Sequence, residues 1–527
     1  MAPQEGHDGA GACRGFGAAC TAPCCLNAPS EENFIPHVEH TSFLPDRDMG
    51  GDEGKVERMA KRHDLIILGG GAAAFSAAIR ADRNGAEALM IDGGTIGGTC
   101  VNVGCVPSKR LLAVGDQFFR VANHPFPGLH LEDGWSSEFR AVIRSKDRLV
   151  ADLRKAKYAD VLASLKDVEY VRGQAVFVSP HEVKVGTERY EGDKFVIGTG
   201  SSPTIPQVPG IDKVDYLTNV EALSLKERPN SLIVLGGRAL GLEFAQMYQH
   251  LGTQVTVLQR SPRIAPEEEP EISQYLEEYL KEDGIQIHTG AEVLSAEQRN
   301  GRKIVVARVG GRKRVIEADE LLLATGRTPN TAELNLQSAR IDVKEDHGVK
   351  VDSEMRSTAR HIFAAGDVIG KPMLETAAAK EGYIAAENAL ANRGLKMDYR
   401  AVPHAVFTNP AVASVGPTDA QANADRRVRC ACNTIMLKQV PKPLIVEDTR
   451  GLVKIVAEAK SHKILGVHIL ASLAPDMIHE GVLAVKHSLT LEDIIDTVHV
   501  FPTHSEAIKL AALSFFEDVD KLSCCAM

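Results

Sequence analysis

Two cysteines give this chain of 527 residues its clearest chemical signal. Cys100 and Cys105 lie in the stretch GGTCVNVGCVPSK, and Lys109 follows the second cysteine by one helical turn. A lysine ammonium and the start of a helix each lower a thiol pKa, so the pattern favours a reactive thiolate. A step of five residues turns a regular helix by about 500° and separates the two side chains. We therefore predict a redox dithiol with a distorted backbone between the cysteines, which Gly104 and Pro107 allow.

A glycine-rich turn precedes the dithiol. The run DLIILGGGAAAFSAAIRADRNG predicts a buried strand, a tight turn and a helix, and ALMID predicts a second strand. Gly69, Gly71 and Ala74 fit the GxGxxG/A pattern, in which the helix amino terminus binds a pyrophosphate. Asp92 ends the second strand, where a carboxylate accepts hydrogen bonds from a ribose hydroxyl. These features together predict a dinucleotide-binding domain.

A second nucleotide unit is predicted from SLIVLGGRALGLEFAQMYQHLGTQVTVLQRSPR. Gly236 and Gly241 fit the outer glycines, and Arg238 occupies the middle position. Arg260 and Arg263 follow the second strand, where a diol-binding site would carry an acidic residue. Two arginines attract a ribose phosphate, so the pattern favours NADPH over NADH. A solvated basic turn is the alternative interpretation.

Three later stretches return the chain to the first nucleotide domain. VIGTGSSP contains Thr199 and Gly200, and LLLATGRTPN contains Gly326; both are apolar strands that end in small residues. HIFAAGDVIG brings Gly366 and Asp367 to a strand end, where a carboxylate can bind a sugar hydroxyl. Beyond residue 404, apolar strands alternate with helical runs, which is typical of a separate α+β domain.

Composition limits the classes of function. A net charge of -10 argues against a general binder of nucleic acid or anionic membrane. No apolar stretch approaches the ~18 residues that span a bilayer, and the first residues lack a leader pattern, so we expect a cytoplasmic protein. The ten cysteines fall into clusters and show no zinc-ribbon spacing, which favours redox or soft-metal chemistry. The cysteines without an assigned role are Cys13, Cys20, Cys24, Cys25, Cys430 and Cys432.

From residue 62 to the end, the order of these motifs resembles the flavin-dependent pyridine-nucleotide disulfide oxidoreductases. Within that family the chain is similar to the mercuric reductases, because it ends in LSCCAM with Cys524 and Cys525. Disulfide-reducing members carry a histidine before a proline near the carboxyl end. Phe501 stands at that position, although Glu506 remains. Reduction of a metal ion needs no such acid, whereas a leaving thiolate does. Mercuric reductases often have a tyrosine where Thr503 lies.

The resemblance implies an α/β fold with two Rossmann-like nucleotide-binding domains and a C-terminal α+β dimerisation domain. It divides the chain into a flexible Cys-containing extension (1–61), the first part of an FAD-binding domain (62–204), an NAD(P)H-binding domain (205–330), the remaining FAD-binding or central part (331–403), and the dimerisation domain with its Cys-Cys tail (404–527). It also implies FAD and NADPH as cofactors and a homodimer with active sites shared between subunits.

The resemblance further implies the site roles. Cys105 is the thiolate beside the flavin, Cys100 is its partner, and Lys109 pairs with Glu243. Gly98, Thr99 and Lys109 are assigned to FAD together with the residues of the first motif. Cys524 and Cys525 would capture Hg(II) from thiolate complexes and pass it to Cys100 and Cys105 for reduction to Hg(0). The alternatives are a disulfide reductase similar to dihydrolipoamide dehydrogenase and a nonenzymatic thiol buffer.

Overall fold

The first nucleotide domain is built on a seven-stranded sheet of order β3-β2-β1-β6-β5-β4, with β16 paired to β6. The computed structural model describes residues 61–126, 129, 138–424 and 429–523. The strands of this sheet are β1 (Lys61–Leu68), β2 (Ala88–Asp92), β3 (Val168–Arg172), β4 (Ala175–Ser179), β5 (Glu182–Val185), β6 (Glu188–Ile197) and β16 (Ile362–Ala364). Its central strands are parallel, and their apolar segments, such as Leu65–Leu68 and Phe195–Ile197, are buried.

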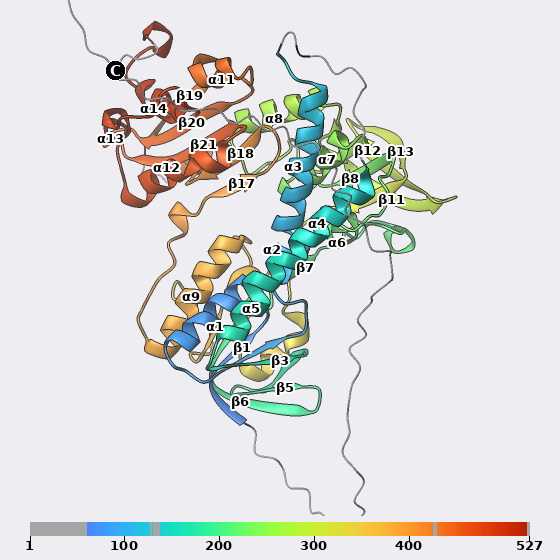
Figure 1. Cartoon of the computed structure of the whole chain (residues 1–527), viewed down its shortest axis with the longest axis vertical. Helices are drawn as coiled ribbons and strands as arrows, with labels where there is room; N and C mark the ends of the chain where they lie inside the picture. Colours follow the sequence, from blue (N-terminus) through green and yellow to red (C-terminus); the bar gives the residue numbers. More distant parts are fainter. Residues whose placement is uncertain (1–60, 127–128, 130–137, 425–428, 524–527) are drawn as a thin grey trace, which may run out of the picture. The chain divides into compact units, whose positions relative to one another are not determined.

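Two helices from distant parts of the sequence pack together on this sheet. They are α1 (Ala72–Arg83) and α9 (Glu375–Ala391), which lie side by side in Figure 1. Gly382 of α9 permits the close approach, because a Cβ there would come 2.1 Å from the carbonyl oxygen of Ala73. β7 (Ser201–Pro203) and β15 (Arg327–Pro329) form a short antiparallel ribbon. This ribbon joins the two segments in which the chain crosses between the nucleotide domains.

The second nucleotide domain has a parallel sheet of order β10-β9-β8-β14 and a three-stranded antiparallel sheet. The parallel strands are β8 (Ser231–Leu235), β9 (Gln254–Leu258), β10 (Gln286–His288) and β14 (Glu320–Leu323). The antiparallel strands are β11 (Glu292–Arg299), β12 (Arg302–Val309) and β13 (Arg312–Ala318), and the helices are α6 (Asn219–Ala222), α7 (Ala239–His250) and α8 (Pro270–Glu282). The predicted strand, turn, helix and strand of the second motif are thus present.

The C-terminal part has a five-stranded antiparallel sheet of order β17-β18-β21-β20-β19. Its strands are β17 (His404–Val406), β18 (Ala411–Val415), β19 (Cys430–Met436), β20 (Leu452–Glu458) and β21 (Ile464–Ala471). Its helices are α10 (Asp419–Ala424), α11 (Pro441–Ile445), α12 (Ala474–His487), α13 (Leu491–Asp496) and α14 (Glu506–Leu513). One face of the sheet forms an apolar core with α12 and α14.

Long helices connect the first nucleotide domain to the second. They are α2 (Gly98–Val103), α3 (Cys105–Ala122) and α4 (Phe139–Arg154), which continues through a π-helical turn (Lys155–Ala159) into α5 (Asp160–Ser164). α3 packs against both α4 and α7 (Figure 1). Among the described helices none is long and apolar enough to cross a membrane.

Candidate active site

A cavity of about 700 Å³ opens beside the first glycine-rich turn. Seven predicted cofactor residues line it: Gly69, Gly71, Asp92, Gly98, Thr99, Thr199 and Gly200. The turn needs its first glycine, because Gly69 has φ +122° and a Cβ there would come 2.2 Å from the carbonyl oxygen of Gly198. Ala74 lies behind the turn, fully buried in α1, where it packs helix against strand.

Asp92 is the carboxyl group on the side of the cavity that carries the glycine-rich turn. The side chain is 9 % exposed; its Oδ1 accepts the backbone N–H of Gly94 at 3.1 Å, and its Oδ2 is buried without a hydrogen-bond partner. Burial raises the pKa of Asp92. An unpartnered carboxylate oxygen beside a glycine turn fits the ribose diol of a dinucleotide, so the residues present suit FAD.

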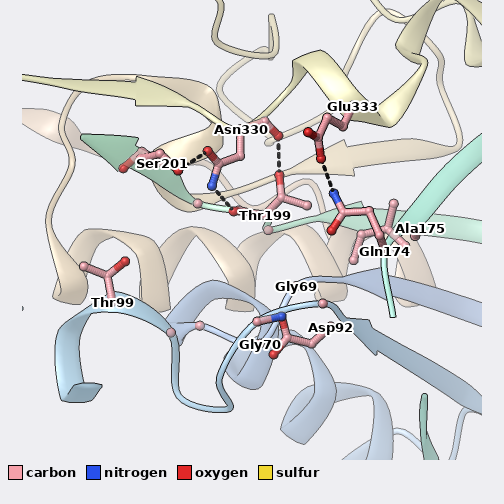
Figure 2. Close-up of a pocket in the computed structure, with 18 of the residues that line it drawn as sticks. Gly69, Gly70, Asp92, Thr99, Gln174, Ala175, Thr199, Ser201, Asn330 and Glu333 are labelled. Carbon is pink, nitrogen blue, oxygen red and sulfur yellow. Dashed lines mark hydrogen bonds between the residues drawn. The ribbon is translucent and has the colours of Figure 1, made fainter. Parts of the chain in front are cut away.

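The opposite wall of the cavity contains residues that sequence analysis missed. Figure 2 shows Asn330, Gln174 and Glu333 across the cavity from Asp92. The amide of Asn330 donates to the carbonyl oxygen of Thr199 at 2.9 Å, and the Thr199 hydroxyl donates to the carbonyl oxygen of Asn330 at 2.9 Å. This reciprocal pair fixes the two chain crossings to each other. The sequence signal that could have identified Asn330 is its position directly after Thr328 and Pro329.

We expect Asp92→Asn to weaken FAD binding by roughly thirtyfold, or about 2 kcal/mol, because the amide keeps the shape but loses the charged acceptor. The measurement is the free FAD concentration after ultrafiltration of dilute protein. Glu87→Gln, on the exposed surface of the same domain, is the matched control. Equal FAD retention in both variants would exclude the proposed role of Asp92.

The two candidate redox cysteines lie on either side of a helix break. Cys100 is half-buried within α2, Cys105 is exposed as the first residue of α3, and both are free thiols. Gly104 separates the helices with φ -130° and ψ -115°. The predicted distortion is therefore present. It is centred on Gly104, while Pro107 lies inside the first turn of α3.

Proton affinity differs between the two thiols. A hydrogen bond between Cys100 and Cys105 lowers the pKa of Cys105, and the nearby Lys109 ammonium lowers it further. The same hydrogen bond, together with burial, raises the pKa of Cys100. Both shifts favour Cys105 over Cys100 as the thiolate, in the direction of the predicted division of roles.

Gly104 keeps the two thiols together. A Cβ at this position would come 2.9 Å from the carbonyl oxygen of Thr99 and 3.2 Å from the Cα of Cys100. We expect Gly104→Ala to push α2 away from α3 and to slow bridging of the thiol pair by dibromobimane at least about tenfold. Ala113→Ser, at an exposed position of α3, should leave the bridging rate unchanged. Unaltered bridging in Gly104→Ala would contradict this account.

Lys109 is held by a group from the second nucleotide domain. Its Nζ lies 2.7 Å from Oε2 of Glu243, whose side chain is 7 % exposed. Oε1 of the same carboxylate accepts the backbone N–H of Phe407 at 3.0 Å, and the ammonium lies 4.5 Å from the centre of the Phe407 ring. Three separate parts of the chain therefore meet at Lys109. The contribution of this ion pair at the flavin stays a prediction.

Glu375 and Tyr158 border the dithiol, and no sequence signal pointed to either. Glu375 begins α9, and its Oε1 lies 3.5 Å from the Tyr158 hydroxyl, which donates to it. Burial raises the pKa of Glu375, and its carboxyl also hydrogen-bonds with the Cys100 thiol. Glu375 and Tyr158 are both distant from the dithiol in the sequence, so only the fold brings them close to it.

The second glycine motif forms an equally tight turn. Gly236 has φ +115°, and a Cβ on Gly241 would come 1.9 Å from the carbonyl oxygen of Gly236. Arg238 caps the start of α7 and forms an ion pair with Glu267 at 3.4 Å. The Arg238 side chain is therefore paired with the loop that follows β9.

The two arginines after β9 differ in their surroundings. Arg263 donates from its guanidinium to the carbonyl oxygens of Pro266 at 2.9 Å and Glu268 at 3.2 Å, so it stabilises its own loop. Arg260 is exposed and forms no ion pair within the part of the chain that the structure describes. Of the two, Arg260 is the one available to a ribose phosphate.

Three other predicted cofactor residues lie outside the lining of the 700 Å³ cavity. Asp367 accepts a hydrogen bond from the Ser201 hydroxyl at 2.6 Å, and Gly366 has φ +78° at the start of the same turn. Gly326 has φ +118° before β15. Asp367 thus bonds to the ribbon strand that carries Ser201, and its contact with a sugar stays a prediction.

The carboxyl-terminal signature is partly described. Phe501 is 46 % exposed, and Thr503 donates to the carbonyl oxygen of Val500 at 2.8 Å. His504 is 6 % exposed, as expected for a packing residue, and Oε2 of Glu506 is buried without a partner. Six cysteines lie outside the described residues: Cys13, Cys20, Cys24, Cys25, Cys524 and Cys525. The predicted extension before residue 61 lies outside them as well.

Family models account for most of the chain. Residues 63–382 match the pyridine nucleotide-disulphide oxidoreductase model, and residues 402–512 match the dimerisation domain of the same family. This chain belongs to the pyridine nucleotide-disulphide oxidoreductase family. The predicted fold class is thereby confirmed, and the cofactors are those of the family, FAD and a pyridine nucleotide. The exact domain boundaries stay predictions.

Curated relatives within this family are mercuric reductases. The protein from Staphylococcus aureus is 40% identical over 498 residues, which cover 94% of this chain and 88% of the relative. The protein from Streptomyces lividans is 42% identical over 471 residues, which cover 88% and 98%. A solved structure, the Cu(II) complex of the HOCl-induced flavoprotein disulfide reductase RclA from Escherichia coli, aligns with a TM-score of 0.77 and 27% identity over 87% of this chain and 100% of that one.

Proposed function

We propose that this protein is a mercury(II) reductase that uses NADPH and FAD and thereby detoxifies mercury. The observation that carries the proposal is a dithiol beside a dinucleotide cavity in a chain that is 40% identical to a mercuric reductase over nearly its whole length. Thiolates are the softest ligands that a protein offers, and Hg(II) is a soft ion.

The residues of the site act on the metal ion in a simple order. FAD, when bound, stores the two electrons that the reaction consumes. The Cys105 thiolate, stabilised by the nearby Lys109 ammonium, displaces one small thiolate from the incoming ion, and Cys100 displaces the second to complete a two-coordinate dithiolate complex, its proton passing to the departing thiolate. Lys109 is fixed by Glu243, so its charge stays beside Cys105 throughout.

Phe501 favours this function over a disulfide reductase. A disulfide reductase needs an acid to protonate the leaving thiolate, and a phenylalanine ring supplies no proton. The buried carboxylate of Glu506, which would orient such an acid, has no partner on its Oε2. A pure thiol buffer would need neither glycine-rich nucleotide motif, and the family of this chain is a family of oxidoreductases.

The decisive experiment measures Hg(II)-dependent NADPH oxidation by the purified flavoprotein in excess small thiol, with volatile mercury trapped. We expect stoichiometric release of Hg(0). Rapid turnover of lipoamide or another disulfide without volatile mercury would overturn the proposal. An apoprotein prepared without FAD is the control, since sequestration alone would persist in it.

The carboxyl-terminal pair is assigned to delivery. We expect Cys524→Ala/Cys525→Ala to lower kcat/KM for Hg(II) by about tenfold or more, because a second dithiol that delivers the ion is lost. NADPH-dependent reduction of the flavin should stay unchanged in the same variant, which separates delivery from chemistry. Identical kcat/KM values for variant and parent would remove the tail from the mechanism.

Coenzyme choice, assembly and location complete the proposal. NADPH is favoured because Arg260 is exposed and unpaired among the described residues after β9. A homodimer is favoured by the matched dimerisation domain, and active sites shared between its subunits would bring Cys524 and Cys525 to the partner's dithiol. A cytoplasmic location suits the described cysteines, which are all free thiols.

A further inference from the structure

A second pair of thiols lies on the edge strand of the C-terminal sheet. Cys430 and Cys432 begin β19, which pairs only with β20 among the described strands. Side chains two residues apart on a strand point to the same face. Cys430 lies opposite Glu458, and Cys432 lies opposite Val456, on the face turned away from the apolar core. Both thiols are free and half-buried.

A carboxylate lies beside the pair and holds one of its thiols. The Cys430 thiol donates to Oδ1 of Asp419 at 3.2 Å. Burial raises the pKa of Cys432, and the nearby Asp419 carboxylate raises it further. Asp419 is itself fixed, because its Oδ1 accepts the amide of Asn423 at 2.8 Å and its backbone N–H donates to the buried Glu269 at 2.6 Å.

The spacing of the pair disfavours a disulfide and favours a bridging ion. Two residues of a strand span about 6.7 Å between Cα atoms, at the outer limit for an unstrained disulfide. A two-coordinate soft ion with metal to sulfur bonds of about 2.3 Å needs sulfur atoms only about 4.6 Å apart, which two flexible thiols can reach. No group of three or more His, Cys, Asp or Glu side chains that could hold a metal ion occurs among the described residues, so the pair is considered as a two-ligand site.

We propose that Cys430 and Cys432 form a second binding site for a soft, two-coordinate cation such as Hg(II), separate from the Cys100 and Cys105 dithiol. β19 packs against β20, α10 and α14, whereas the dithiol lies on α2 and α3. Binding is ligand exchange without a change of oxidation state. Two bonds between Hg(II) and small thiolates break, two bonds to Cys430 and Cys432 form, and the two released protons pass to the departing thiolates.

The charge balance of the pocket supports a cation. Lys454 lies on the same face of the sheet, but its ammonium is bound to Glu269 and Glu271, each at 3.0 Å. The Cys430 thiol therefore faces the Asp419 carboxylate, and the Lys454 ammonium is already paired. A dithiolate complex of a divalent cation is neutral, so it adds no net charge beside Asp419.

The test counts mercury on the full-length flavoprotein without NADPH, so that it does not depend on reduction. Protein is loaded with Hg(II) in excess cysteine, desalted and analysed by metal mass spectrometry. We expect Cys430→Ser, Cys432→Ser and the double variant each to lose one ion per protomer, because one ion needs both sulfurs. Thr434→Ser, two residues along the same face, is the matched control and should lose none.

Other stoichiometries overturn the proposal. Full retention in either single variant, or a double variant that loses two ions, would indicate independent monothiol binding. A second measurement uses the unmodified chain, in case a variant fails to fold. Trypsin releases residues 430–438 as one peptide with both thiols, and prior Hg(II) should protect both from iodoacetamide. Unprotected thiols in this peptide would contradict the second cation site even if the protein reduces mercury.

Discussion

Replacing Cys105 with serine is expected to lower Hg(II)-dependent NADPH oxidation by at least about a thousandfold. The physical reason is twofold. A serine hydroxyl stays protonated at neutral pH, so neither Cys100 nor Lys109 can stabilise a charge on it. Its oxygen is also a hard donor, which binds a soft ion poorly. Steady-state kinetics with trapped Hg(0) provide the measurement, and Cys100→Ser should be impaired to a similar degree.

The control for this substitution is another cysteine to serine change. Cys13→Ser removes a thiol to which no role is assigned and should keep the full rate of reduction. FAD content and anaerobic bleaching of the flavin by NADPH should be normal in Cys105→Ser, which would localise the defect to the metal-binding step. A Cys105→Ser protein that keeps more than a tenth of the parent rate would refute the role of this thiolate.

Replacing Glu243 with glutamine is expected to lower the free energy of unfolding by about 3 kcal/mol, which is the lower end for breaking a buried ion pair. Lys109 would keep its charge without a counterion, and its side chain is only 33% exposed. The bond from the Phe407 backbone N–H would also weaken, because an amide oxygen is a poorer acceptor than a carboxylate. Urea unfolding followed by circular dichroism gives the value.

A double variant separates the ion pair from packing. Lys109→Met/Glu243→Gln contains no unpaired charge, so we expect it to recover at least half of the lost stability. The same double variant should still lack normal dithiol reactivity, because Cys105 has lost its ammonium neighbour. If the losses in free energy of unfolding from the two single substitutions instead add in the double variant, the pair is not coupled and the interpretation of the site is wrong.

Local sequence predicted the elements that bind nucleotides. GxGxxG/A turns are short-range structures, since Gly69 and Gly236 need positive φ within a few residues of a buried strand. The helix break at Gly104 follows in the same way from the residues between the cysteines. Arg263 shows the limit of such reasoning. Its place after a strand favoured contact with a ribose phosphate, whereas its guanidinium donates to carbonyl oxygens of its own loop.

The sequence by itself determined the strands, the glycine turns and the reactive thiol pair, because each depends on neighbours along the chain. Only the tertiary structure decided which distant groups surround that pair. Glu375 and Tyr158 meet there through α9 and the π-helical turn, and Asn330 closes the cavity above Thr199. Cys430 likewise gains its carboxylate partner only where α10 packs on β19. Such contacts arise from long-range packing, whose partners no local pattern encodes.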